Sequence, residues 1–128
     1  MKFNKHLFFI IFFIGITNQC FTQVKKDTLS VLFVGNSYTY YSNMPHLVSL
    51  ISDSTKVKLT TSKSTAGGAR LSDHWNGNKG LKSKEAISSG KYDIIVLQGQ
   101  SKEAVMEKEE FLIYSKKLSD LALSLIHI

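Results

Sequence analysis

The sequence predicts an α/β fold built around a parallel β-sheet. Strand-like and helix-like segments alternate along the chain, and the strand-like segments Leu29–Gly35 and Tyr92–Gln98 are apolar enough for burial on both faces. The 128 residues include 43% hydrophobic and 20% charged residues, which is the balance of a globular domain. The length allows one small domain at most.

The elements before the first long loop have clear signals. The strand Leu29–Gly35 ends at a glycine, and a helix is expected to begin at Met44 because Pro45 suits a first helical turn. An apolar stripe at helical spacing follows at Leu47, Val48, Leu50 and Ile51. Alternation in Val57–Thr61 predicts the second strand.

The second half of the chain repeats this order. Ser62–Gly80 is rich in Gly, Ser, Thr and Asn, which predicts a loop with one helical turn near Leu71–Trp75. Leu81–Ser89 is expected to form a short helix, and the third strand Tyr92–Gln98 follows it. Glu103–Leu123 predicts an amphipathic helix, with its acidic residues near the start and lysines nearer the end, as the helix dipole favours.

The first 23 residues have the pattern of a secretory signal peptide. Lys2 and Lys5 precede Leu7–Ile16, an apolar run too short to span a bilayer as a mature helix. We therefore expect a periplasmic or secreted protein. Lipidation at Cys20 and an uncleaved anchor remain alternatives, and no membrane association beyond export is expected without them.

Composition excludes several classes of function. The net charge is +6, but two of the lysines lie in the leader and the others alternate with acidic residues. Because no basic stripe with interleaved aromatics is present, nucleic-acid binding is not expected. A single Cys excludes an internal disulfide framework and any multi-Cys zinc or iron–sulfur site. No cofactor and no metal are expected.

Polar loops follow all three expected strands, at the edge where parallel α/β sheets bind ligands. Ser37, after Gly35 and Asn36, is either an activated nucleophile or a helix-capping serine. The paired Gly67 and Gly68 are either oxyanion donors or a flexible turn.

Two further features of these loops have competing interpretations. Asp73-His74 is read as a surface pair or a packed histidine rather than a metal or acid–base site, because adjacent residues on a turn point in different directions. The amides of Gln98-Gly99-Gln100-Ser101 could donate hydrogen bonds to an oxyanion, or Ser101 could cap the following helix.

Together these segments resemble the first three sequence blocks of the SGNH (GDSL-type) hydrolases, and in particular an extracytoplasmic bacterial branch of unknown function. The resemblance implies a three-layer α/β/α flavodoxin-like fold, of which residues 29–122 would supply the first three parallel strands in the order 2-1-3. The third block is also similar to the Gln-Gly-Glu-Ser of carbohydrate O-acetyl esterases.

The resemblance also implies roles for individual residues. Ser37 would be the nucleophile, with its own N–H as one oxyanion donor. Gly68, or alternatively Gly67, would be the second donor, and the amide of Gln98, or alternatively Gln100, would take the place of the family's Asn. The chain departs from the common pattern in that glutamine and in Asn36, where the family usually has Asp.

The family's Asp-x-x-His block, which supplies the base and its orienting acid, does not occur in the sequence. Moreover, Leu123–Ile128 (LSLIHI) is what CTGTCTCTTATACACATC encodes, the end of a transposon sequencing adapter. We therefore expect an inactive N-terminal fragment whose residues 123–128 are a non-native tail.

The expected function of the full-length protein is that of a secreted serine esterase. Its substrate would be a small-molecule or carbohydrate ester, most plausibly acetyl on carbohydrate. The alternative is a non-catalytic extracytoplasmic module that binds a glycan or another ligand on the same scaffold.

Overall fold

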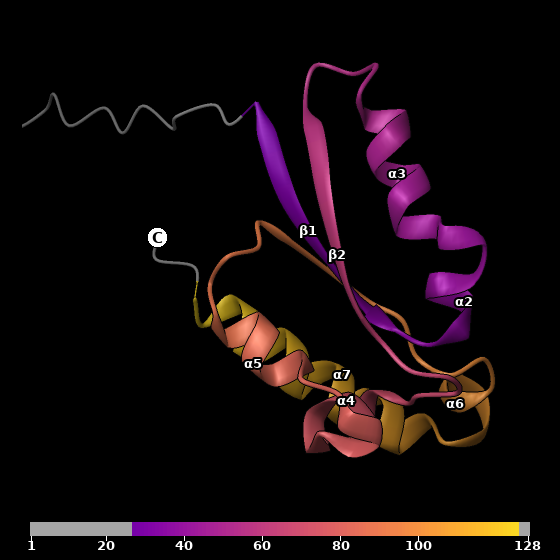
Figure 1. Cartoon of the computed structure of the whole chain (residues 1–128). Coiled ribbons are helices and arrows are strands. Elements are labelled where there is room, and N and C mark those ends of the chain that lie inside the picture. Colours follow the sequence, from indigo (N-terminus) through magenta and orange to yellow (C-terminus); the bar gives the residue numbers. More distant parts are fainter. Residues whose placement is uncertain (1–26, 126–128) are drawn as a thin grey trace, which may run out of the picture.

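A computed structural model describes residues 27–125 of the chain. The expected signal peptide at residues 1–23, and residues 126–128 of the expected tail, lie outside the described residues. Strands and helices alternate along the described part in the expected order (Figure 1). No helix within it is long and apolar enough to cross a membrane.

A three-stranded parallel sheet forms the centre of the structure. Its strands are β1 (Thr28–Gly35), β2 (Lys58–Thr65) and β3 (Ile94–Leu97). Their order is β2-β1-β3, and β1 pairs in parallel with both neighbours. Because Val34 lies opposite Ser64 of β2 and Leu97 of β3, the carboxyl ends of the strands meet at one edge. The predicted parallel sheet and its 2-1-3 order are confirmed.

Helices cover both faces of this sheet, which makes the predicted three layers (Figure 1). One face carries α3 (Met44–Ser52), which packs on β2. The other face carries α4 (Leu71–Asn76), α5 (Ser83–Ser88) and α7 (Lys108–Leu123). Four short helical segments complete the chain: α2 (Ser37–Tyr40), η1 (Tyr41–Asn43), η2 (Asn78–Gly80) and α6 (Glu103–Met106).

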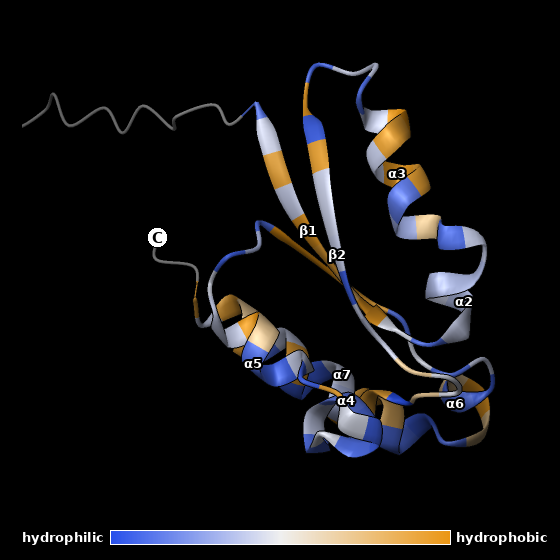
Figure 2. Cartoon of the chain, viewed as in Figure 1, coloured by the Kyte–Doolittle hydropathy of each residue, from blue (hydrophilic) through white to orange (hydrophobic). Residues whose placement is uncertain are grey.

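The hydrophobic core lies between the sheet and the α4–α5–α7 layer. Its fully buried members are Leu32, Val34, Leu71, Ile87 and Leu118. Since alternate residues of a strand point to opposite faces, the buried Val31 and Phe33 face the α3 layer instead. The two outer strands differ in composition. Figure 2 shows that β3 is hydrophobic along its length, whereas β2 consists mainly of polar residues.

The strand boundaries differ from the sequence predictions in opposite directions. β2 runs to Thr65 rather than Thr61, although Ser62–Thr65 is polar. An edge strand needs no continuous apolar run, and its backbone pairing with β1 up to Gly35 decides its length. β3 is shorter than the expected Tyr92–Gln98, because its residues pair with only Val31–Val34 of β1.

The helices also show two departures. The expected helix Glu103–Leu123 is broken at Glu107, whose backbone (φ −133°, ψ 43°) is not helical and whose carboxylate pairs with the Arg70 guanidinium. The short α2 was not predicted, and it makes Ser37 the first residue of a helical turn. α7 runs through Leu123, and Leu125 packs partly against the core. The adapter origin of the tail stays a prediction.

Candidate active site

Ser37 lies directly beyond the carboxyl end of β1. Gly35 ends the strand and Asn36 caps the N-terminus of α2, so that Ser37 begins the helical turn. A side chain at Gly35 would clash with the Thr39 hydroxyl and lie 2.7 Å from Gln98 Oε1. Only glycine therefore lets the chain turn this sharply under the serine.

Asn36 ties together the three polar loops that the sequence placed at this edge. Its side chain is 1% exposed, and its Nδ2 donates to the carbonyl oxygens of Ala69 (3.0 Å) and Gly99 (3.2 Å). Its Oδ1 accepts from Tyr38 N–H at 3.1 Å. A carboxylate could not make the two donor bonds, since an ionised Asp only accepts. This gives a physical reason for Asn at a position where the resemblance leads one to expect Asp.

Gln98 lies beside the same turn. Its Oε1 accepts from Asn36 N–H at 3.1 Å and from the Thr39 hydroxyl at 2.9 Å. Its Nε2 donates to Gly99 O, a carbonyl that also accepts from Asn36 Nδ2. If Gln98 Nε2 turned towards an oxyanion, Gly99 O would keep one hydrogen bond. The amide is thus held at the nucleophile loop with a donor that can be released.

Gln100, the alternative amide, is engaged within its own loop. Its Nε2 donates to Ser101 Oγ at 3.2 Å, and its Oε1 accepts from Lys102 N–H at 2.9 Å. The structure therefore brings Gln98, and not the side chain of Gln100, into contact with the residue before Ser37.

The paired glycines form a β-turn at the end of β2. Ala69 N–H donates to Ala66 O at 3.2 Å, and Gly68 adopts φ +59°, as the third residue of a type II turn requires. A Cβ on Gly68 would meet nothing within 4 Å, so the backbone there is open to a ligand. Within residues 27–125, the N–H groups of Ser37 and Gly68 make no hydrogen bond, which leaves both available as donors.

A buried carboxylate that the sequence analysis missed joins two of these loops. Glu103 is 1% exposed, and its two oxygens accept from Gln100 N–H (2.7 Å) and Leu71 N–H (3.2 Å). Asn36 thus binds the carbonyls of the second and third loops, while Glu103 binds their N–H groups. The available signal was an acidic residue three positions after a polar turn residue, the spacing of a capping box.

His74 lies beneath the turn and is fully buried. Its Nε2 lies 3.1 Å from Gly35 O and its Nδ1 2.6 Å from Ser83 Oγ, which in turn lies 2.8 Å from Ser64 Oγ. Because a carbonyl only accepts, Nε2 carries a proton. His74 is therefore the packed histidine considered in the sequence analysis.

Burial and neighbouring groups shift the pKa values of this pair. Burial lowers the pKa of His74, and this outweighs the Gly35 carbonyl and the Asp73 charge, which raise it. For Asp73, burial raises the pKa, but hydrogen bonds from Arg70 N–H, Asn78 and Lys79 bring it below its ordinary value. Neither group reaches Ser37. Among the described residues, no cluster of His, Cys, Asp or Glu could hold a metal ion.

The Ser37 side chain is half-buried, and its hydroxyl makes no hydrogen bond in the described part of the chain. The site therefore offers a reachable hydroxyl, two free backbone donors and a nearby carboxamide. These are the components of nucleophilic acyl transfer, apart from the base that takes the proton.

Comparison with known proteins supports the fold. No family model matches the sequence, and no curated protein matches it. A solved structure described as "a putative SGNH hydrolase from Slackia heliotrinireducens" is similar to this chain, with a TM-score of 0.62 and 23% identity over 77% of this chain.

The similar region covers 52% of that protein, so the chain spans about half the length of its structural neighbour. Together with the order of the strands, this likeness shows that the chain has the flavodoxin-like α/β/α fold of the SGNH hydrolases.

Proposed function

We propose that this chain carries the nucleophile and the oxyanion donors of an exported serine esterase. The observation that carries the proposal is Asn36, which hydrogen-bonds both other loops while placing Ser37 at the carboxyl edge of the sheet. Polar loops converging on a free serine hydroxyl fit acyl transfer better than a cap, because the hydroxyl of Ser37 caps nothing in the described structure.

The proposed reaction follows from the chemistry of these groups. Ser37 Oγ attacks the ester carbonyl carbon while a base from outside residues 27–125 takes its proton. The backbone N–H groups of Ser37 and Gly68, and Nε2 of Gln98, donate to the oxyanion that forms. Collapse expels the alcohol with that proton, and water then releases the acid from the acyl-enzyme.

The substrate is an ester-linked acyl group, and we propose acetyl on carbohydrate. The similarity of Gln98-Gly99-Gln100-Ser101 to the carbohydrate esterase block supports this class. Export by residues 1–23 would bring the enzyme to extracytoplasmic polysaccharide.

The test is hydrolysis of ethyl acetate by the full-length protein and its Ser37→Ala variant. We expect Ser37→Ala to abolish acetate release and labelling by a fluorophosphonate probe, while circular dichroism and the melting temperature stay unchanged. Ser101→Ala, in the exposed part of the third loop, is the matched control and should keep both activities. Unchanged hydrolysis in Ser37→Ala would refute the nucleophile assignment. A folded full-length protein that neither labels nor hydrolyses would favour the binding module.

A further inference from the structure

We propose that three tyrosines next to Ser37 form the subsite for the sugar ring of the substrate. This tyrosine rim consists of Tyr38, Tyr40 and Tyr41, and the inference rests on the proposed esterase function. The three side chains are 67%, 38% and 76% exposed, respectively, although aromatic rings of this size usually contribute to a core. Their exposure means that packing within residues 27–125 does not explain them.

The geometry of α2 places Tyr40 and Tyr41 about one helical turn after the nucleophile. Tyr41 N–H donates to Ser37 O, so Tyr41 lies one helical turn after Ser37, and Tyr40 is the other residue on that face. Helical side chains lean towards the N-terminus of their helix, which is the end of α2 where Ser37 lies. Tyr38 extends the rim on the neighbouring face.

The rim also reaches the oxyanion loop. The Tyr40 hydroxyl lies 3.6 Å from where a Cβ on Gly67 would be, so the Tyr40 side chain reaches from α2 to the glycine turn. A substrate carbonyl placed between Ser37 and Gly68 would therefore have the remainder of its molecule beside the tyrosines.

The chain keeps the rim exposed at a conformational cost. After α2 it passes through Ser42 (φ 52°) and Asn43 (φ 54°), two non-glycine residues in the left-handed region, before α3 begins. Each non-glycine residue in this region costs conformational free energy, which other interactions in the fold must offset. The kink ends the helix after one turn and leaves Tyr41 at its end, where the side chain is exposed.

The chemistry of tyrosine selects the ligand class. A pyranose ring has an apolar face of C–H groups and hydroxyl groups around its edge. A tyrosine side chain complements both, because its aromatic face is apolar and its hydroxyl is polar. A fatty acyl chain would be matched by aliphatic side chains, whereas the exposed large side chains of α2 and of the residue that follows it are tyrosines. The rim therefore fits the alcohol part of a carbohydrate ester.

The test compares two acetyl esters on the full-length protein: mono-acetylated xylotriose, which carries sugar rings, and ethyl acetate, which carries none. In the triple variant Tyr38→Ala, Tyr40→Ala, Tyr41→Ala, we expect kcat/KM for the sugar ester to fall at least tenfold more than for ethyl acetate, mainly through KM. Tyr41→Trp should retain more of the preference than Tyr41→Ala. Ile51→Ala, an equally exposed apolar residue on α3, should leave the preference unchanged.

Several outcomes would overturn the inference. Equal losses on both esters, or no loss on either, would show that the rim does not select the sugar. If phenyl acetate responded as strongly as the sugar ester, the rim would bind flat rings in general and the carbohydrate assignment would be wrong.

If the unmodified protein hydrolyses neither ester, it is the proposed function that fails. The tyrosine rim is then tested by measuring the affinity of the protein for xylotriose by calorimetry. Binding that the triple variant loses by tenfold or more supports the rim, and absence of binding to the unmodified protein refutes it.

Discussion

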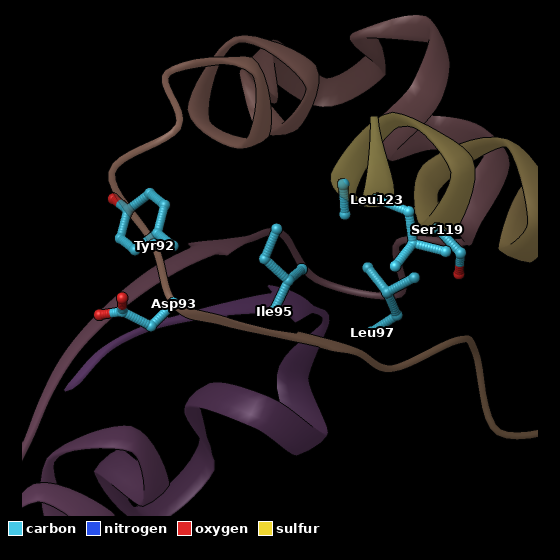
Figure 3. A pocket seen from close by; sticks show the side chains of 7 residues that line it. Tyr92, Asp93, Ile95, Leu97, Ser119 and Leu123 are labelled. Atoms are coloured by element: carbon cyan, nitrogen blue, oxygen red, sulfur yellow. The ribbon is translucent and has the colours of Figure 1, made fainter. Parts of the chain in front are cut away.

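The carboxyl edge of the sheet and the outer side of β3 differ in how far the described chain satisfies their polar and apolar groups. At the carboxyl edge the buried polar groups of Asn36, Glu103 and His74 are all hydrogen-bonded within the chain. Beside β3, an apolar groove of about 360 Å³ opens between the strand and α7. Figure 3 shows Ile95 and Leu97 of β3 pointing towards α7 across this groove.

The other face of β3 is partly exposed. Ile94 and Val96 are 39% and 37% exposed, and no described residue pairs with the outer edge of the strand. The comparison teaches that the buried side chains beneath the polar site find their partners within the described chain, whereas the most apolar strand keeps an unpaired edge and partly exposed faces. Unsatisfied strand edges with apolar faces favour association with other chains.

The largest effect we expect is on solubility. The chain expressed from Val24 to Ile128 should give insoluble or molten material without esterase turnover, because the edge and faces of β3 are accessible. The double variant Ile94→Lys, Val96→Lys should raise the soluble yield by placing charges on the exposed face. Thr60→Lys, on the exposed side of the opposite edge strand, is the control. A soluble monomer with a sharp cooperative melt before any substitution would contradict this prediction.

The next effect concerns catalysis at the polar edge. Gln98→Ala in the full-length protein should lower the proposed esterase turnover roughly 10²–10³-fold, the usual loss for one oxyanion donor. Gln100→Ala should lower it far less, because that side chain bonds only Ser101 and Lys102. Measured kcat values for ethyl acetate distinguish the two amides. A larger loss in Gln100→Ala would reverse the assignment.

Asn36→Asp tests whether the polar links hold the site together. The carboxylate would face the carbonyl oxygens of Ala69 and Gly99, so the free energy of unfolding at pH 7 should fall by about 2–4 kcal/mol. Denaturant unfolding of the full-length protein measures this. Asn76→Asp, at the exposed end of α4, should change stability by less than about 0.5 kcal/mol. Equal stability of the two variants would mean that the links contribute nothing.

The smallest effect is a pH dependence that arises from His74. Its folded-state pKa is lowered from 6.5, so its contribution to stability is complete above pH 6.5. As the pH falls through 6.5 and then the folded-state pKa, the unfolded chain binds the proton first, and stability declines.

Thermal melts between pH 8 and pH 5 should show this decline in the unmodified protein and a flatter profile in His74→Gln. Asp73 does not confuse the measurement, because its lowered pKa lies below 3.8 and its loss of stability begins only at lower pH. Parallel profiles for the two proteins would exclude His74 as the source.

Sequence reasoning was most accurate where local pattern and chain topology decide the outcome. The apolar run ending at Gly35 gave the central strand nearly to the residue, and Pro45 marked the start of α3 correctly. Strand boundaries were less accurate for β2 and β3, because pairing with β1 sets their length. The break at Glu107 was not predictable either, and the residue that pairs with Glu107, Arg70, lies 37 residues earlier in the chain.

The sequence by itself determined that the chain forms a parallel α/β sheet and that Ser37, Gly68 and Gln98 follow its strands at one edge. Apolar periodicity and the handedness of crossovers are enough for that. Only the tertiary structure decided which polar atoms meet at this edge. Asn36 is hydrogen-bonded to Gly99, 63 residues away in the sequence. Glu103 is hydrogen-bonded to Leu71, 32 residues away, and His74 to Gly35, 39 residues away. Such pairings depend on the orientation of side chains after packing, because buried donors and acceptors must find partners wherever the fold places them.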